Sequence, residues 1–176
     1  MSVRGVDAGD GSEQATPAVA PVQNIADRAA IARLIPHQGG MCLWDEVLGW
    51  DAASIRLRTW RHRDPAHPLR SHGRLHAIHL CEYGAQAMAV HGGLRARAAG
   101  GIARPGLLVA LRGVELHVAR IDDLDGALEC EARLLIDGDS GWQYDFRIHH
   151  EGRLLAEGRA AVMPQPADSK GIEGHG

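Results

Sequence analysis

The pattern of apolar and polar positions predicts a set of strands that follow one another along the chain. Residues 54–61 alternate strictly, with Ile55 and Leu57 on one side and arginines on the other, which is the period of a half-buried strand. The same alternation recurs in four later segments, which are 114–118, 128–134, 142–149 and 154–163. Turn-rich stretches at 137–141 and 151–152 join the last three segments as hairpins. The pattern therefore predicts an antiparallel sheet with one buried face.

Residues 76–91 change to a helical period. Their apolar face is built from small residues and a few larger ones, which are Ala77, Leu80, Cys81, Gly84, Ala85 and Met88. A neighbouring backbone can pack very close to such a face. Gly92 and Gly93 give an end signal for this helix, although the pattern could continue to Arg97. Since this is the one long helix available to cover the sheet, the sequence predicts an α+β fold in which the sheet wraps around a central helix.

A short helix is predicted near the start of the folded region. Asn24 or Asp27 can cap it, and Pro36 ends it. Residues 1–23 and 164–176 lack periodicity and are rich in small, Pro and acidic residues, so we expect a flexible leader and a flexible tail. The sequence then predicts one domain over residues 24–163.

Composition excludes several classes of function. The net charge of −3 and the aromatic content of 4% argue against nucleic acid as a partner. No apolar run is long enough for a membrane span. The 3 cysteines form no CxxC pair, so neither a disulfide framework nor a zinc knuckle is indicated. The N-terminus has no signal-peptide pattern, and we expect a cytoplasmic protein.

Two segments carry a resemblance to a known family. The first is LIPH at 34–37 followed by MCLWDEV at 41–47, and the second is CEYGAQ at 81–86. Together they resemble the hotdog-fold 3-hydroxyacyl-(acyl carrier protein) dehydratases. With HRDPAHPLR at 62–70, the chain is most similar to the dehydratase-like proteins of aryl-polyene biosynthesis clusters. The resemblance implies a hotdog fold, an antiparallel sheet wrapped around one long helix, across residues 25–163.

The resemblance also implies site residues. Glu82 on the helix would work with a histidine from the loop before it, because dehydration needs one proton removed and one delivered. The family's compact histidine loop is replaced here by the longer stretch 62–68. His62 is the first choice because it lies a few residues before a proline, and His67 is the second. A plainer interpretation makes Glu82 part of the solvent-facing side of the helix.

Supporting roles are predicted for other residues. Gln86 lies one turn after Glu82 and could orient it. Backbone N–H groups from Leu75 to Ala77 could stabilise the thioester oxygen. We expect His37 to make a supporting contact near the substrate. A further cluster, His72, His76, His79, Cys81 and Glu82, does not have the HExxH spacing, so we predict no metal site.

The resemblance and the local charge predict partners. No cofactor is expected beyond the phosphopantetheine that carries the substrate on an acyl carrier protein. The region before the helix is locally basic and could dock that acidic protein or its phosphate, and its arginines are Arg56, Arg58, Arg61, Arg63, Arg70 and Arg74. A solvated strand face would explain the same arginines. Hotdog domains usually pair edge to edge, so we expect a homodimer, or a heteromer with a related hotdog or ketosynthase subunit.

Three functions compete at this point. The first is a dehydratase that converts a carrier-bound 3-hydroxyacyl thioester to the trans-2-enoyl thioester. The second is a hotdog thioesterase, in which Glu82 would activate water without a loop histidine. The third is a non-catalytic acyl-binding or partner subunit. The length and aryl or polyene character of the acyl chain depend on the shape of the binding site, which a single sequence does not reveal.

Overall fold

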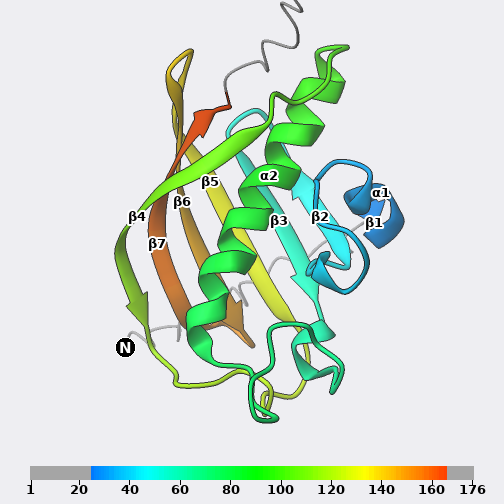
Figure 1. Cartoon of the computed structure of the whole chain (residues 1–176), viewed down its shortest axis with the longest axis vertical. Coiled ribbons are helices and arrows are strands. Elements are labelled where there is room, and N and C mark those ends of the chain that lie inside the picture. The colour runs from blue at the N-terminus through cyan, green and yellow to red at the C-terminus, as the bar shows by residue number, and fades with distance from the viewer. Residues whose placement is uncertain (1–24, 166–176) are drawn as a thin grey trace, which may run out of the picture.

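The computed structural model describes residues 25–165, so the predicted leader (1–23) and all but the start of the predicted tail (164–176) lie outside the described residues. Seven strands form one antiparallel sheet that curves around the long helix α2 (Figure 1). The strand order is β1-β2-β3-β5-β6-β7-β4. The strands are β1 Ala26–Asp27, β2 Glu46–Trp50, β3 Ser54–Thr59, β4 Gly106–Leu116, β5 Leu128–Gly138, β6 Gly141–His150 and β7 Arg153–Pro164. The predicted α+β hotdog architecture is confirmed.

The helix α2 spans Leu80–Ala98 and follows a 3₁₀ turn at Ala77–His79. Its small residues allow the close approach that the sequence predicts. A Cβ on Gly84 would lie 2.7 Å from Cγ of Phe146 on β6, and a Cβ on Gly93 would lie 2.9 Å from Cβ of Leu34. The helix therefore continues through Gly92 and Gly93, which the sequence offers as an end signal, and Gly93 packs there against Leu34.

The short helix α1 (Arg28–Ala32) begins at Asp27 rather than Asn24. The Asp27 carboxylate accepts a hydrogen bond from the backbone N–H of Ala30 at 2.8 Å, as an N-cap does. Ile31 is the buried residue of this helix and joins the main core. The helix ends before Pro36, as predicted.

The edge strand β4 starts eight residues earlier than the alternation at Val114 predicts. Residues 107–111 are consecutively apolar, so they carry no period of two. The structure explains this, because β4 pairs only with β7 and most of its side chains are exposed, which removes the difference between an inner and an outer face.

Few aromatic residues lie in the core, and each has a defined place. Trp44, Tyr83 and Phe146 are its largest buried side chains. The Trp44 indole N–H donates to the Tyr83 carbonyl at 3.0 Å, and the two rings meet edge to face. Neighbouring Asp45 accepts hydrogen bonds from the Thr59 hydroxyl and the Trp60 N–H. The MCLWDEV motif thus fastens β2 to β3 and to the helix.

The described residues hold no helix that is both long enough and apolar enough to cross a bilayer.

Candidate functional site

Glu82 projects from the first turn of α2 and is held from two sides. His37 Nε2 lies 3.3 Å from Glu82 Oε1, and the side-chain N–H of Gln86 donates to the same oxygen at 3.0 Å. About a third of the Glu82 side chain is exposed. The other carboxylate oxygen, Oε2, makes no hydrogen bond within the described part of the chain. The arrangement leaves one oxygen fixed and one oxygen available.

Gln86 is fully buried and connects the helix to the loop that carries His37. Its amide N–H also donates to the Met41 carbonyl at 2.8 Å, and its Oε1 accepts from the Leu43 N–H at 3.0 Å. Three hydrogen bonds therefore fix the amide and, through it, the position of Glu82. The contact between Gln86 and Glu82 that the helical spacing predicts is present.

The histidine at Glu82 is His37, which the sequence assigned only a supporting contact. Its loop is anchored by Arg28, which donates to the carbonyls of Gly39 and Cys42. His37 Nδ1 is buried and has no hydrogen-bond partner within residues 25–165. Nε2 is turned to Glu82 and Nδ1 is buried, while about a third of the His37 side chain stays exposed.

The structure does not bring the first-choice catalytic residue, His62, into contact with Glu82. Its side chain is fully buried, and Nε2 donates to the Leu124 carbonyl at 3.0 Å. Burial lowers the pKa of the imidazole below its ordinary value, because the charged form is poorly solvated there. The longer loop therefore places the His62 side chain inside the protein, where its hydrogen bond links residues 61–63 to the segment before β5.

The second choice, His67, is also a packed residue. Its Nδ1 accepts from the Leu69 N–H at 3.2 Å, so Nε2 carries the proton and donates to the Tyr83 hydroxyl at 2.9 Å. The ring stacks on Tyr83. Desolvation lowers the pKa of His67 to about 4. Both nitrogens are occupied by the fold, so neither can take a proton from a substrate.

Two of the predicted oxyanion donors are occupied as well. The Leu75 N–H donates to Asp122 Oδ1 at 2.9 Å, and the Ala77 N–H donates to the Ala119 carbonyl at 3.0 Å. Ala77 itself is buried. These two amides hold the start of the helix to residues 119–122, where they were expected to be free.

A groove of about 780 Å³ begins at His37 and Glu82 and follows α2 toward its C-terminal end. Small and apolar residues line its middle, including Leu34, Ala85, Met88, Ala89 and Gly92. Polar residues gather where the helix ends, and they include Arg95, Arg104, Asp137, Tyr144 and Gln165. The chain turns back after α2 into β4 and forms one wall there (Figure 1). The groove can hold an extended, mostly apolar chain with its reacting end at Glu82.

Most of the arginines predicted to form a basic docking patch are neutralised by ion pairs. Arg58 lies 2.8 Å from Glu129, and Arg63 lies 2.9 Å from Asp125. The other pairs are Arg61 with Asp64 and Arg70 with Asp122. Since each pair cancels a charge, this region presents far less positive potential than its sequence suggests.

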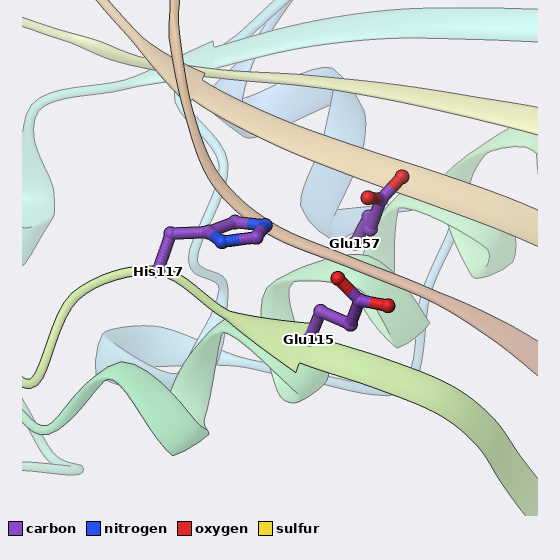
Figure 2. Close-up of side chains that lie close together, drawn as sticks. All are labelled: Glu115, His117 and Glu157. Atoms are coloured by element: carbon purple, nitrogen blue, oxygen red, sulfur yellow. The ribbon is translucent and has the colours of Figure 1, made fainter.

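A separate cluster joins Glu115, His117 and Glu157, whose ligand atoms all lie within 4.8 Å of one another (Figure 2). This is the one group of possible metal ligands that residues 25–165 bring together, and it involves none of the histidines near α2. Glu157 lies on the sheet face opposite α2, since it alternates with buried neighbours, and it pairs with Arg147 at 3.1 Å. The cluster is remote from the groove and is not part of the site.

Comparisons with known proteins agree with this fold. A model of the ApeP-like family, described as ApeP dehydratase, matches residues 29–172. The dehydratase heterocomplex ApeI:P from Xenorhabdus doucetiae is similar in structure, with 22% identity, a TM-score of 0.70, and coverage of 77% of this chain and 91% of that chain. AziG from S. sahachiroi is also similar, with 17% identity, a TM-score of 0.51, and coverage of 69% and 90%. No curated protein matches the sequence.

Proposed function

The chain belongs to the ApeP-like dehydratase family, and we propose that it dehydrates a 3-hydroxyacyl thioester carried by the phosphopantetheine arm of an acyl carrier protein. The product is the trans-2-enoyl thioester, in a fatty-acid-like or aryl-polyene pathway. The observation that supports this best is the carboxylate of Glu82, held by His37 and Gln86 at the end of an apolar groove. No cofactor other than the carrier's arm is required.

The reaction breaks the C2–H and C3–O bonds, forms the C2=C3 double bond and releases water. Glu82 Oε2 is the oxygen that would exchange a proton with the substrate, because Oε1 is already engaged by His37 and Gln86. The apolar lining next to the carboxylate suits proton transfer by a carboxyl group. His37 and Gln86 are positioning residues that fix the angle at which Glu82 meets the substrate.

Dehydration needs a second proton-transfer group, which we assign to a partner subunit. His62 and His67 are held inside the fold, so a second copy of this chain would bring the same buried histidines. A related hotdog subunit with a free loop histidine would complete the site. The similar structure from Xenorhabdus doucetiae is itself described as a dehydratase heterocomplex.

The edge strand β4 is suited to receive that subunit. It is eleven residues long, pairs on one side only, and exposes large apolar side chains, which are Leu107, Leu108, Val109, Leu111 and Leu116. A long apolar edge strand is a template for pairing with another chain. Pairing there would also cover the open side of the groove, because Gly106 and Leu108 line it.

The test is turnover of a 3-hydroxyacyl carrier protein by the chain alone and by its complex with a co-expressed related hotdog subunit. Product masses separate the three functions: loss of water indicates a dehydratase, loss of the acyl group a thioesterase, and no change a non-catalytic subunit. We expect loss of water by the complex. Glu82→Gln should lower kcat by about 100-fold or more, whereas Glu151→Gln in the exposed β6–β7 turn should not. Full activity of Glu82→Gln would refute the assignment.

A further inference from the structure

We propose that Arg104, supported by Arg95, binds the phosphate of the phosphopantetheine arm at the far end of the groove, so that the groove holds the arm rather than the acyl chain. This inference rests on the proposed function, since it concerns how the carrier-bound substrate reaches Glu82. It replaces the basic patch before the helix, whose arginines are mostly used in ion pairs.

The charges at this end of the groove favour an anion. Arg95 pairs with Asp137 at 2.5 Å, and their charges cancel. Arg104 is exposed, makes no ion pair within residues 25–165, and stacks on Trp142 with its guanidinium carbon 5.6 Å from the ring centroid. The Trp142 ring holds the guanidinium in place while leaving its N–H groups available for phosphate oxygens. The groove mouth therefore keeps one uncompensated positive charge.

A guanidinium group is needed there for a second reason. The C-terminal end of a helix carries partial negative charge, which by itself repels a phosphate. At this end of α2, Arg95 and Arg97 lie in the last turn, and Arg104 follows after the turn at Gly100. The arginines offset the helix dipole, and Arg104, which lines the groove and is in no ion pair among the described residues, can bind the anion.

The length of the groove matches the length of the arm. Glu82 and Arg95 are thirteen positions apart on α2, which corresponds to about 20 Å at 1.5 Å per residue. The arm and thioester place roughly sixteen bonds between phosphorus and C3 of the substrate. Three extended chain bonds span about 3.6 Å, so sixteen span about 19 Å. A phosphate at the level of Arg95, where Arg104 also lines the groove, would thus leave C2 and C3 beside Glu82.

The lining between the two ends leaves room for the arm. Gly92 is small where the dimethyl group next to the phosphate would lie, and Ala85 and Ala89 leave space for the chain beyond it. The mouth is also accessible to a carrier protein too large to enter the groove, because Ile102, Arg104 and Pro105 are exposed.

The experiment compares two small substrates on the complete complex: a 3-hydroxyacyl phosphopantetheine and the same thioester of pantetheine, which lacks the phosphate. For the unmodified protein we expect removal of the phosphate to raise KM by about tenfold with kcat unchanged. Arg104→Ala should raise KM for the phosphorylated substrate by about tenfold and leave the other unaffected. Arg104→Lys should restore part of the difference. Arg97→Ala, in the same last turn but outside the groove lining, is the matched control.

Two results would overturn the inference. If Arg104→Ala leaves the effect of the phosphate intact, the phosphate binds elsewhere. If Arg104→Ala instead changes KM only for substrates with a polar group at the end of the acyl chain, the groove holds the acyl chain. Failure of the proposed function looks different, because the unmodified complex would then turn over neither substrate. Equal thermal melting of the variants excludes misfolding as the cause.

Discussion

The buried histidine His67 gives a quantitative prediction about acid stability. Its pKa falls from an ordinary value of 6.5 to about 4 in the folded protein, because desolvation opposes the charged ring. Between these two values the unfolded chain binds about one more proton at this residue than the folded chain does. The free energy of unfolding therefore falls by about 1.4 kcal/mol for each pH unit, and by about 3 kcal/mol across the interval. The free energy of unfolding is unaffected by the titration of this residue above pH 6.5, and the full loss is reached as the pH falls toward 4.

The variant His67→Gln isolates this effect, since glutamine can still donate to the Tyr83 hydroxyl but does not titrate. Urea unfolding of both proteins between pH 7.5 and about 4 gives the difference in unfolding free energy at each pH, and other titrating groups cancel. We expect this difference to shift by about 3 kcal/mol in favour of the variant as the pH falls. Parallel curves would refute the reasoning. Turnover near neutral pH should survive the substitution, which separates a packed histidine from a catalytic one.

Three further changes test the fold and its edge. Gly84→Val places a side chain against the Phe146 ring, where even a Cβ would lie 2.7 Å from Cγ, and should destabilise the protein by about 2 kcal/mol or more in thermal melts. Asp122→Asn removes a nearly buried carboxylate that bonds Arg70 and the Leu75 N–H, and a loss of about 3 kcal/mol in urea unfolding is expected. Leu108→Lys on the β4 edge should weaken partner binding in ultracentrifugation while leaving the melting temperature of the isolated chain unchanged.

The sheet and the central helix could be predicted because their signals are local. Alternation marks β3 and β5 to β7, since each has one face on the core, and small residues mark the face of α2 that meets the sheet. The first part of β4 was not predicted, because the local signal is absent there. An edge strand exposed on both faces has no alternation to detect, and its role depends on a chain outside the sequence.

The contact between Glu82 and Gln86 could be predicted because the two residues share a helix, whereas the histidine that contacts Glu82 comes from a loop and could not. Glu82 and Gln86 are one turn apart, so their contact follows from helical geometry alone. Whether His37, His62 or His67 reaches Glu82 depends on how two irregular loops fold back on the helix, and no local pattern encodes that. Each histidine makes a contact that a single sequence cannot reveal: His37 with Glu82, His62 with the Leu124 carbonyl, and His67 with the Tyr83 hydroxyl.

The fate of the three histidines has a mechanistic consequence. Dehydration moves one proton off C2 and one onto the leaving hydroxyl, and the imidazole beside Glu82 is that of His37, 3.3 Å away. His62 and His67 are buried, so any further proton-transfer group at this site would come from another subunit. The exposed edge of β4 lies along the open side of the groove, which is where a second subunit could supply that group. The burial of His62 and His67 and the unpaired edge of β4 together support the proposal that this chain works with a second subunit.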